Sequence, residues 1–318
     1  MTLYRDIISK ALILAWRHKY LWVFAFFAAL AGNGGELELA YSGSDSVNGQ
    51  SYILGILRAF YQNGSLSQIM QNIRDFFGRY PLPSIFLVLL LLLLAVLLIW
   101  IVIVAQAALF WAIARIQEKR AVSFQESFST GARFFSPIFL LNLIAKVIIL
   151  GVIFLIAFPL GLQYIRSGAT LYNGLYILTV FLALVPISII ISFIVKYASI
   201  YVVLRGQTWR AAFKNSWALF FKNWLVSIEV AFVLFIINLV TSLLLSFLLL
   251  LLGLITNPAG AILFFLIIMI YGALLATFQY TTWVNLFFAL EGGTARSKIL
   301  RWVDRLTKKT PTQPVPTK

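Results

Sequence analysis

The sequence predicts an all-α, polytopic membrane protein: a helical bundle of six transmembrane helices in three related pairs, with interfacial amphipathic helices. Two observations predict this class. The 318 residues are 62% hydrophobic and 11% charged, with a mean hydropathy of +0.96. Five stretches also run nearly without charge for longer than the about 20 apolar residues that a helix needs to cross a bilayer. A soluble domain has no use for five such stretches.

Five long apolar stretches and a shorter sixth define the predicted spans. The shortest follows a basic amphipathic N-terminal segment, and its Ala29-Leu30-Ala31 sequence is also compatible with signal-peptide cleavage. All six belong to one integral membrane domain, residues 1–309, and the Pro- and Thr-rich residues 310–318 are predicted to be a disordered tail. The predicted spans are residues 20–32, 84–114, 137–165, 171–204, 224–255 and 259–290.

The basic residues fall mainly on one side of this topology. With the N-terminus inside, the inner segments carry 20 Lys and Arg against five acidic residues, whereas the outer segments carry four of each. This asymmetry follows the positive-inside rule and predicts that both termini lie on the cytoplasmic side of the plasma (inner) membrane. The net charge of +15 therefore indicates that the chain meets a membrane surface and does not bind nucleic acid.

The inner connections resemble one another. After spans 84–114 and 171–204 the chain repeats an aromatic and basic pattern, which we call the elbow, and the two chain ends carry the halves of a third copy. Span, elbow and span therefore form a unit that occurs three times. The matched positions are Phe124 with Phe213, Ser127 with Ser216, Phe128 with Trp217, and Phe134-Phe135 with Phe220-Phe221.

Two features predict which helices pack closely. The split third copy predicts that the first and last spans lie side by side and close the arrangement. Small residues four positions apart, Ala108 with Ala112 and Gly272 with Ala276, predict close helix contacts.

Each elbow combines an apolar aromatic stripe with basic residues, as in a helix that lies in the membrane interface. A plain aromatic belt at the span ends is the alternative. The basic residues either orient the chain only or also attract anionic lipid of the inner leaflet. The candidate lipid contacts are Arg115, Arg205, Arg210, Lys214, Arg301 and Arg305.

The predicted outer side has one large connection, residues 33–83. A Gly- and Ser-rich start precedes two short amphipathic helices predicted within residues 51–79, the second with a Ser65–Gln68 capping pattern. These helices either cap the mouth of the bundle or dock a protein partner.

Polar residues inside the spans are the candidates for an intramembrane site. Gln106, Lys196 and Gln279 lie at matching depths of the three inward-running spans, and either line a polar vestibule or form hydrogen bonds between helices. Thr277, Thr281, Thr282 and Asn285 extend this set. Lys146 and Glu229 lie at similar depths of spans 137–165 and 224–255, and either form an ion pair or each reach the membrane interface separately.

The sequence favours no catalytic chemistry. The chain has no cysteine and a single histidine, His18, so thiolate chemistry is excluded and little scope is left for imidazole sites. No P-loop, HExxH or Gly-x-Ser-x-Gly motif is present. We expect no enzymatic activity, no catalytic residue, no cofactor and no metal site.

Residues 211–224, Ala-Ala-Phe-Lys-Asn-Ser-Trp-Ala-Leu-Phe-Phe-Lys-Asn-Trp, resemble an elbow motif of poorly characterised prokaryotic membrane proteins. They are similar to the membrane domain of glycerophosphodiester phosphodiesterases, although Phe213 replaces a Leu-like position. The resemblance implies a shared membrane module in a prokaryotic inner membrane. It transfers no catalytic residue, because no phosphodiesterase barrel follows the sixth predicted span.

Together these patterns predict a non-catalytic integral membrane module that interacts with anionic lipid or with a protein. The alternative is a transporter or channel-like component with a polar site inside the bundle.

Overall fold

A computed structural model describes residues 2–30, 71, 74–75, 77–167, 171–251, 258–293 and 297. The regular structure of these residues is α-helical throughout. Most of the predicted helical pair 51–79, the predicted tail 310–318, and the candidate lipid contacts Arg301 and Arg305 lie outside the described residues.

The five long predicted spans coincide with five long helices, each containing a segment long and apolar enough to cross a membrane. The chain is therefore an all-α, multi-pass membrane protein, as predicted. The long helices are α6 (Pro81–Gln117), α8 (Phe135–Ser167), α9 (Leu171–Arg205), α11 (Trp224–Leu251) and α12 (Pro258–Glu291).

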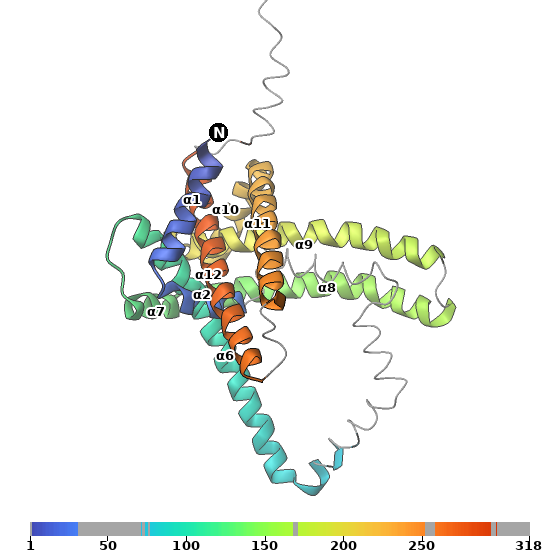
Figure 1. Ribbon diagram of the computed structural model, residues 1–318. Helices are drawn as coiled ribbons and strands as arrows, with labels where there is room; N and C mark the ends of the chain where they lie inside the picture. The colour runs from blue at the N-terminus through green and yellow to red at the C-terminus, as the bar shows by residue number, and fades with distance from the viewer. Residues whose placement is uncertain are drawn as a thin grey trace, which may run out of the picture.

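Shorter helices lie at one end of the long ones (Figure 1). Helix α7 (Phe124–Arg133) joins α6 to α8, and α10 (Trp209–Lys222) joins α9 to α11. Helix α1 (Thr2–Arg17) precedes α2 (Leu21–Ala29) and packs beside α12. We call the ends of the long helices that meet α7, α10 and α1 the elbow ends, and the opposite ends the far ends.

The first predicted span, residues 20–32, is present as a short helix. Its nine residues extend about 14 Å, half of the about 30 Å of hydrocarbon that a spanning helix must cross. The first span was predicted to be the shortest, and within the described residues it is the half-length helix α2, which is not among the five helices long enough to cross a membrane. Its buried residues, Leu21, Phe24, Ala25 and Ala28, pack against α6 and α12.

Helix α2 lies beside α12, which confirms that the first and last predicted spans are neighbours. The Tyr280 hydroxyl of α12 donates a hydrogen bond of 3.2 Å to the Ala28 carbonyl of α2. At the opposite end of α2, the Trp22 Nε1 donates to the Ala15 carbonyl at 2.8 Å and ties α2 to α1.

Each long helix that runs toward an elbow is followed by a residue in the left-handed conformation. Gly206 after α9 has φ +62° and Gly293 after α12 has φ +64°. Lys119 after α6 has φ +60° at a cost of about 1–2 kcal/mol, because its Cβ crowds the following carbonyl. These residues end the helices and turn the chain into the elbows.

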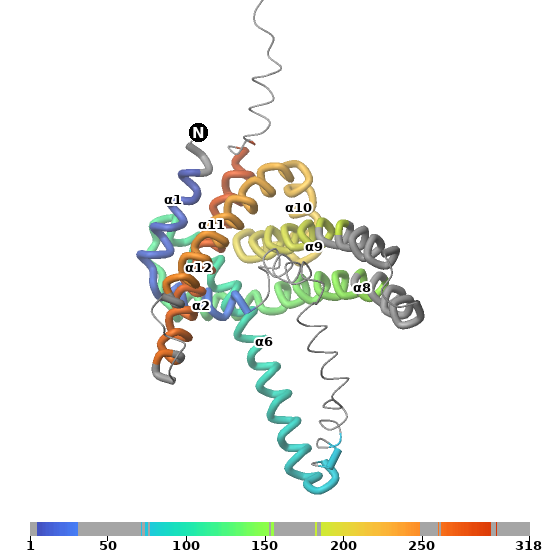
Figure 2. Tube along the Cα trace, turned by 45° about the vertical axis from the view of Figure 1, so that its right-hand side comes forward, coloured from blue at the N-terminus to red at the C-terminus, as the bar shows by residue number. Residues whose placement is uncertain are grey.

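The core lies at the elbow ends and the far ends diverge from it. Burial concentrates in residues 102–114 of α6, 193–203 of α9 and 276–290 of α12. Figures 1 and 2 show α6 running away in one direction while α8 and α9 extend side by side in another. The large apolar side chains of α6 from residue 85 to 99 are each 42% to 69% exposed. Such a surface is favourable against lipid chains and unfavourable in water.

The contact between α7 and α6 depends on a glycine. Ser123 caps α7 by accepting a hydrogen bond of 3.1 Å from the Glu126 amide, which fixes where the helix begins. The helix then lies against α6 at Gly131, where a Cβ would come within 2.5 Å of the Val104 carbonyl oxygen and 2.9 Å of the Ala108 nitrogen. Ala108, predicted to mark a close contact, is thus part of one, whereas a Cβ on Gly272 would meet nothing within 4 Å.

We expect Gly131→Ala to destabilise the protein by about 1–3 kcal/mol, the usual cost of overpacking. The higher helix propensity of alanine opposes this effect, but the clash is with backbone atoms of α6 that cannot move independently. Thermal unfolding in detergent measures the change. Gly151→Ala in α8 is the control, because a Cβ there would meet nothing within 4 Å. Equal unfolding temperatures for the two variants would contradict this packing.

Candidate functional site: the polar core and the basic elbows

Lys196 and Gln279, two of the predicted polar residues, line one cavity of about 80 Å³. Phe110 of α6, Tyr280 and Trp283 of α12 complete most of its wall. The Lys196 side chain is 7% exposed, and its Nζ lies 4.7 Å from the centre of the Trp283 ring. The aromatic face stabilises the ammonium group by a cation–π interaction, which is strong where water is excluded.

Gln106 is fully buried on α6, one turn before Phe110, and does not line this cavity. Its side-chain oxygen accepts a hydrogen bond of 3.2 Å from Asn142 of α8. Its Nε2 is buried and makes no hydrogen bond in the described part of the chain. The structure therefore gives Gln106 a role between α6 and α8. Asn142 was not among the predicted polar residues, although an amide inside an apolar span made it a candidate; its pairing with Gln106 follows only from the tertiary structure.

Of the two alternatives for Lys146 and Glu229, the ion pair does not form in the described structure. Lys146 is exposed on α8, whereas Glu229 of α11 accepts a hydrogen bond of 2.5 Å from Ser297, beyond the end of α12. The two residues share a depth along the chain, but α8 packs against α9 and α6 while α11 lies against α12. Equal depth does not bring side chains together when their helices belong to different parts of the fold.

Several hydrogen bonds between helices lie at the elbow ends, and the Tyr271 hydroxyl of α12 also donates to Thr241 of α11 at 2.7 Å, farther along both helices. Gln117 of α6 donates to Asn285 of α12 at 2.5 Å, and Asn285 donates to the Ile7 carbonyl of α1 at 3.2 Å. The hydroxyls of Tyr197 in α9 and Ser227 in α11 lie 2.8 Å apart. These bonds hold neighbouring helices in register within an apolar core.

The three threonines of α12 do not line a vestibule. Thr277, Thr281 and Thr282 are fully buried, and each hydroxyl donates to the carbonyl four residues earlier in its own helix. Asn285, the fourth polar residue predicted with these threonines, is the one shown to form hydrogen bonds with other helices in the described structure.

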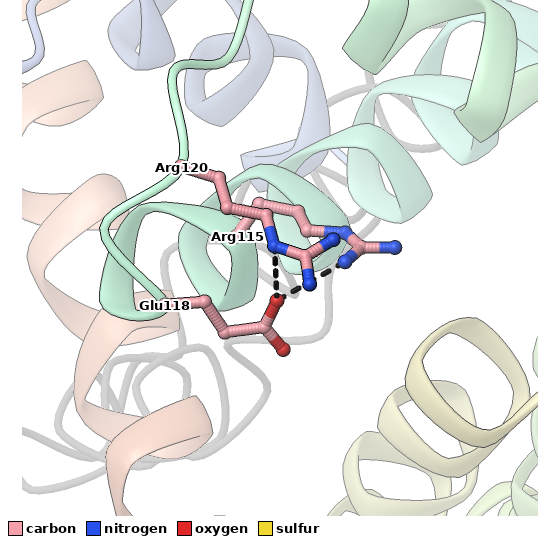
Figure 3. Close-up of polar contacts among 3 residues, drawn as sticks. All are labelled: Arg115, Glu118 and Arg120. Atoms are coloured by element: carbon pink, nitrogen blue, oxygen red, sulfur yellow. Dashed lines mark hydrogen bonds and ion pairs between the residues drawn. The ribbon is translucent and has the colours of Figure 1, made fainter.

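Two of the candidate lipid contacts have protein partners. Arg115 pairs with Glu118 at 3.0 Å, and Arg120 approaches the same carboxylate oxygen at 3.4 Å (Figure 3). Arg205 of α9 pairs with Glu291 of α12 at 2.6 Å and joins the ends of these helices. Because their charge is partly neutralised, Arg115 and Arg205 are weaker candidates for an anionic headgroup than the sequence indicated.

The α10 elbow presents basic residues without such partners. Arg210 is exposed, and its guanidinium carbon lies 5.0 Å from the centre of the Trp209 ring. Lys214 is exposed one turn further along. No ion pair to either residue occurs within the described residues, so both charges face the surroundings.

Comparison of the chain with models of protein families, with curated proteins and with solved structures finds no match. The resemblance of the elbow to the membrane domain of glycerophosphodiester phosphodiesterases therefore stays a prediction. In the part of the chain that the structure describes, no three His, Asp or Glu side chains gather as metal ligands would.

We expect Asn142→Leu to destabilise the protein by about 1 kcal/mol, because it leaves both ends of the buried Gln106 amide without a hydrogen bond. The double variant with Gln106→Leu removes both partners and should recover most of this loss. Unfolding of the two single variants and the double variant in detergent gives the coupling energy. Strictly additive effects would show that the two amides do not interact.

Proposed function

We propose that the chain is a non-catalytic module of the plasma (inner) membrane that interacts with anionic lipid through its elbow ends. The observation that carries this proposal is the gathering of exposed cations on and beside α1, α7 and α10, next to long apolar helix surfaces. Polybasic segments beside a membrane attract anionic headgroups. The exposed cations are Arg5, Lys10, Arg17, Lys19, Lys119, Arg120, Arg133, Arg210, Lys214 and Lys222.

The same cations support the proposed orientation, in which the elbow ends face the cytoplasm. Exposed Arg74 and Arg79, by contrast, lie beside the far end of α6, which this orientation places on the other side of the membrane. The common order of long, short and long helix in α6–α7–α8 and α9–α10–α11 supports the proposed internal repeat. The protein partner predicted for residues 51–79 stays a prediction.

The test measures how much phosphatidylglycerol and phosphatidylcholine surround the full chain after reconstitution into nanodiscs from an equimolar mixture of the two lipids. We expect phosphatidylglycerol to be enriched relative to empty nanodiscs. The double variant Lys10→Gln/Arg133→Gln should lower the enrichment measurably, since each cation near the surface contributes about 1 kcal/mol of attraction to anionic lipid. The matched control is Arg74→Gln/Arg79→Gln, which should change it little. If the two lipids surround the protein in the same equimolar ratio as in the mixture, the proposed function is refuted.

The alternative function, a transporter or channel-like component, is favoured by one observation. Lys196 and Gln279 share a cavity between α2, α6, α9 and α12, and intramembrane cations mark many ion pathways. Chloride efflux from proteoliposomes that is abolished by Lys196→Met, with unfolding temperature unchanged, would favour this alternative. Efflux equal to that of empty liposomes counts against it.

A further inference from the structure

An apolar groove of about 340 Å³ lies between α8, α9 and the elbow helix α10. All eleven residues that line it are apolar, including Ala145 and Ile148 of α8 and Ile190 of α9. This volume falls within the range of about 300–1,000 Å³ that is typical of small-molecule sites. Figures 1 and 2 show α8 and α9 running side by side. Residues of both helices and of α10 line the groove.

Aromatic side chains of α10 form one wall of the groove. Phe213, Trp217 and Phe221 recur at four-residue spacing and therefore share a face of the helix. Trp217 and Phe221 are 48% and 47% exposed although they line the groove, and their ring centres lie 4.8 Å apart. The groove is thus open at an aromatic edge and not sealed inside the core.

Two cations of α10 lie on the same helix face as these aromatic side chains. Arg210 precedes Trp217 by seven residues and Lys214 precedes it by three, so both lie on the helix face that carries the aromatic residues. The sequences of α8, α9 and α10 contain no Asp or Glu. The three helices that build the groove therefore combine an apolar interior with positive charge on α10 and no carboxylate, which is complementary to an amphiphile with an anionic head.

We propose that this groove binds one anionic phospholipid of the surrounding membrane, with an acyl chain between α8 and α9 and the phosphate at Arg210 and Lys214. An acyl chain gains little free energy on moving from lipid to an apolar groove, because both surroundings are hydrocarbon. The groove therefore positions the chain, and the two cations supply the selectivity for an anionic headgroup. This inference rests on the proposed lipid interaction and assigns it to one site.

The experiment uses the full chain in nanodiscs with phosphatidylglycerol that carries a photoreactive diazirine in its acyl chain. After irradiation, peptide mass spectrometry maps the crosslinks. We expect crosslinks to concentrate on the groove residues of α8, α9 and α10. The same diazirine chain on phosphatidylcholine should label these residues at least several-fold less.

Two variants test the two parts of the site. Arg210→Gln/Lys214→Gln should lower the share of phosphatidylglycerol crosslinks that maps to the groove to the phosphatidylcholine level. Ala145→Phe, which places a ring in the groove, should lower the share of crosslinks that maps to the groove for both lipids. The matched control, Arg74→Gln/Arg79→Gln, removes the same charge from exposed positions beside the far end of α6 and should leave the share unchanged. Unfolding temperatures verify that each variant folds.

The outcomes separate this site from the proposed function. Phosphatidylglycerol enrichment around the protein, without preferential labelling of the groove, overturns the groove site and leaves the proposed function standing. Groove labelling that survives Arg210→Gln/Lys214→Gln overturns the headgroup assignment. A dimer whose copies crosslink through the groove and exclude lipid overturns the site as well, since a second copy would then be its occupant. Absence of any enrichment overturns both proposals.

Discussion

Close approach of helices at the elbow ends is the constraint on which the rest of the structure depends. It is possible because small residues occupy the contacts. Gly131 lies against the backbone of α6 at Val104 and Ala108, and the alanines of α1 and α2 that face α12 and α6 are fully buried. Between apolar helices in lipid there is little hydrophobic driving force, so such close contacts and a few interhelical hydrogen bonds must hold the helices together.

This arrangement divides every long helix into two parts with different surroundings. At the elbow ends, the buried Gln106 and Tyr197 and the half-buried Asn285 have hydrogen-bond partners on neighbouring helices. Toward its far end α6 separates from the other long helices and exposes side chains that only hydrocarbon can cover, whereas α8 and α9 stay side by side and Tyr271 of α12 donates to Thr241 of α11. The charged residues of the elbows border the packed part, so the chain brings a rigid core, cations and apolar surface together in one region. That combination is what the proposed lipid interaction requires.

The sequence predicted what depends on composition and periodicity. The five long helices, the elbow helices and the neighbouring positions of α2 and α12 follow from hydropathy and from the repeated pattern. The short first span followed from its short apolar run, but the end of α2 at Ala29 did not, because an apolar run does not show where a helix ends. Which alternative holds for Lys146 and Glu229 did not follow from the sequence, because depth along a helix says nothing about which helices are adjacent or which way a side chain points. Spacing alone gave no signal for features that depend on tertiary contacts. These are the pairing of Asn142 with Gln106, the pairing of Glu291 with Arg205, and the groove beside α10.

The most direct test of this account is spin-label accessibility along α6 in nanodiscs, which the absence of native cysteines makes practical. Labels placed singly at residues 85–114 report collisions with oxygen, which dissolves in lipid. The account predicts high oxygen accessibility around the whole circumference of the helix from residue 85 to 99, and a fall to low values from residue 102 onward. A 3.6-residue periodicity in residues 85–99, with one protected face, would contradict it, because the far end of α6 would then be packed against protein.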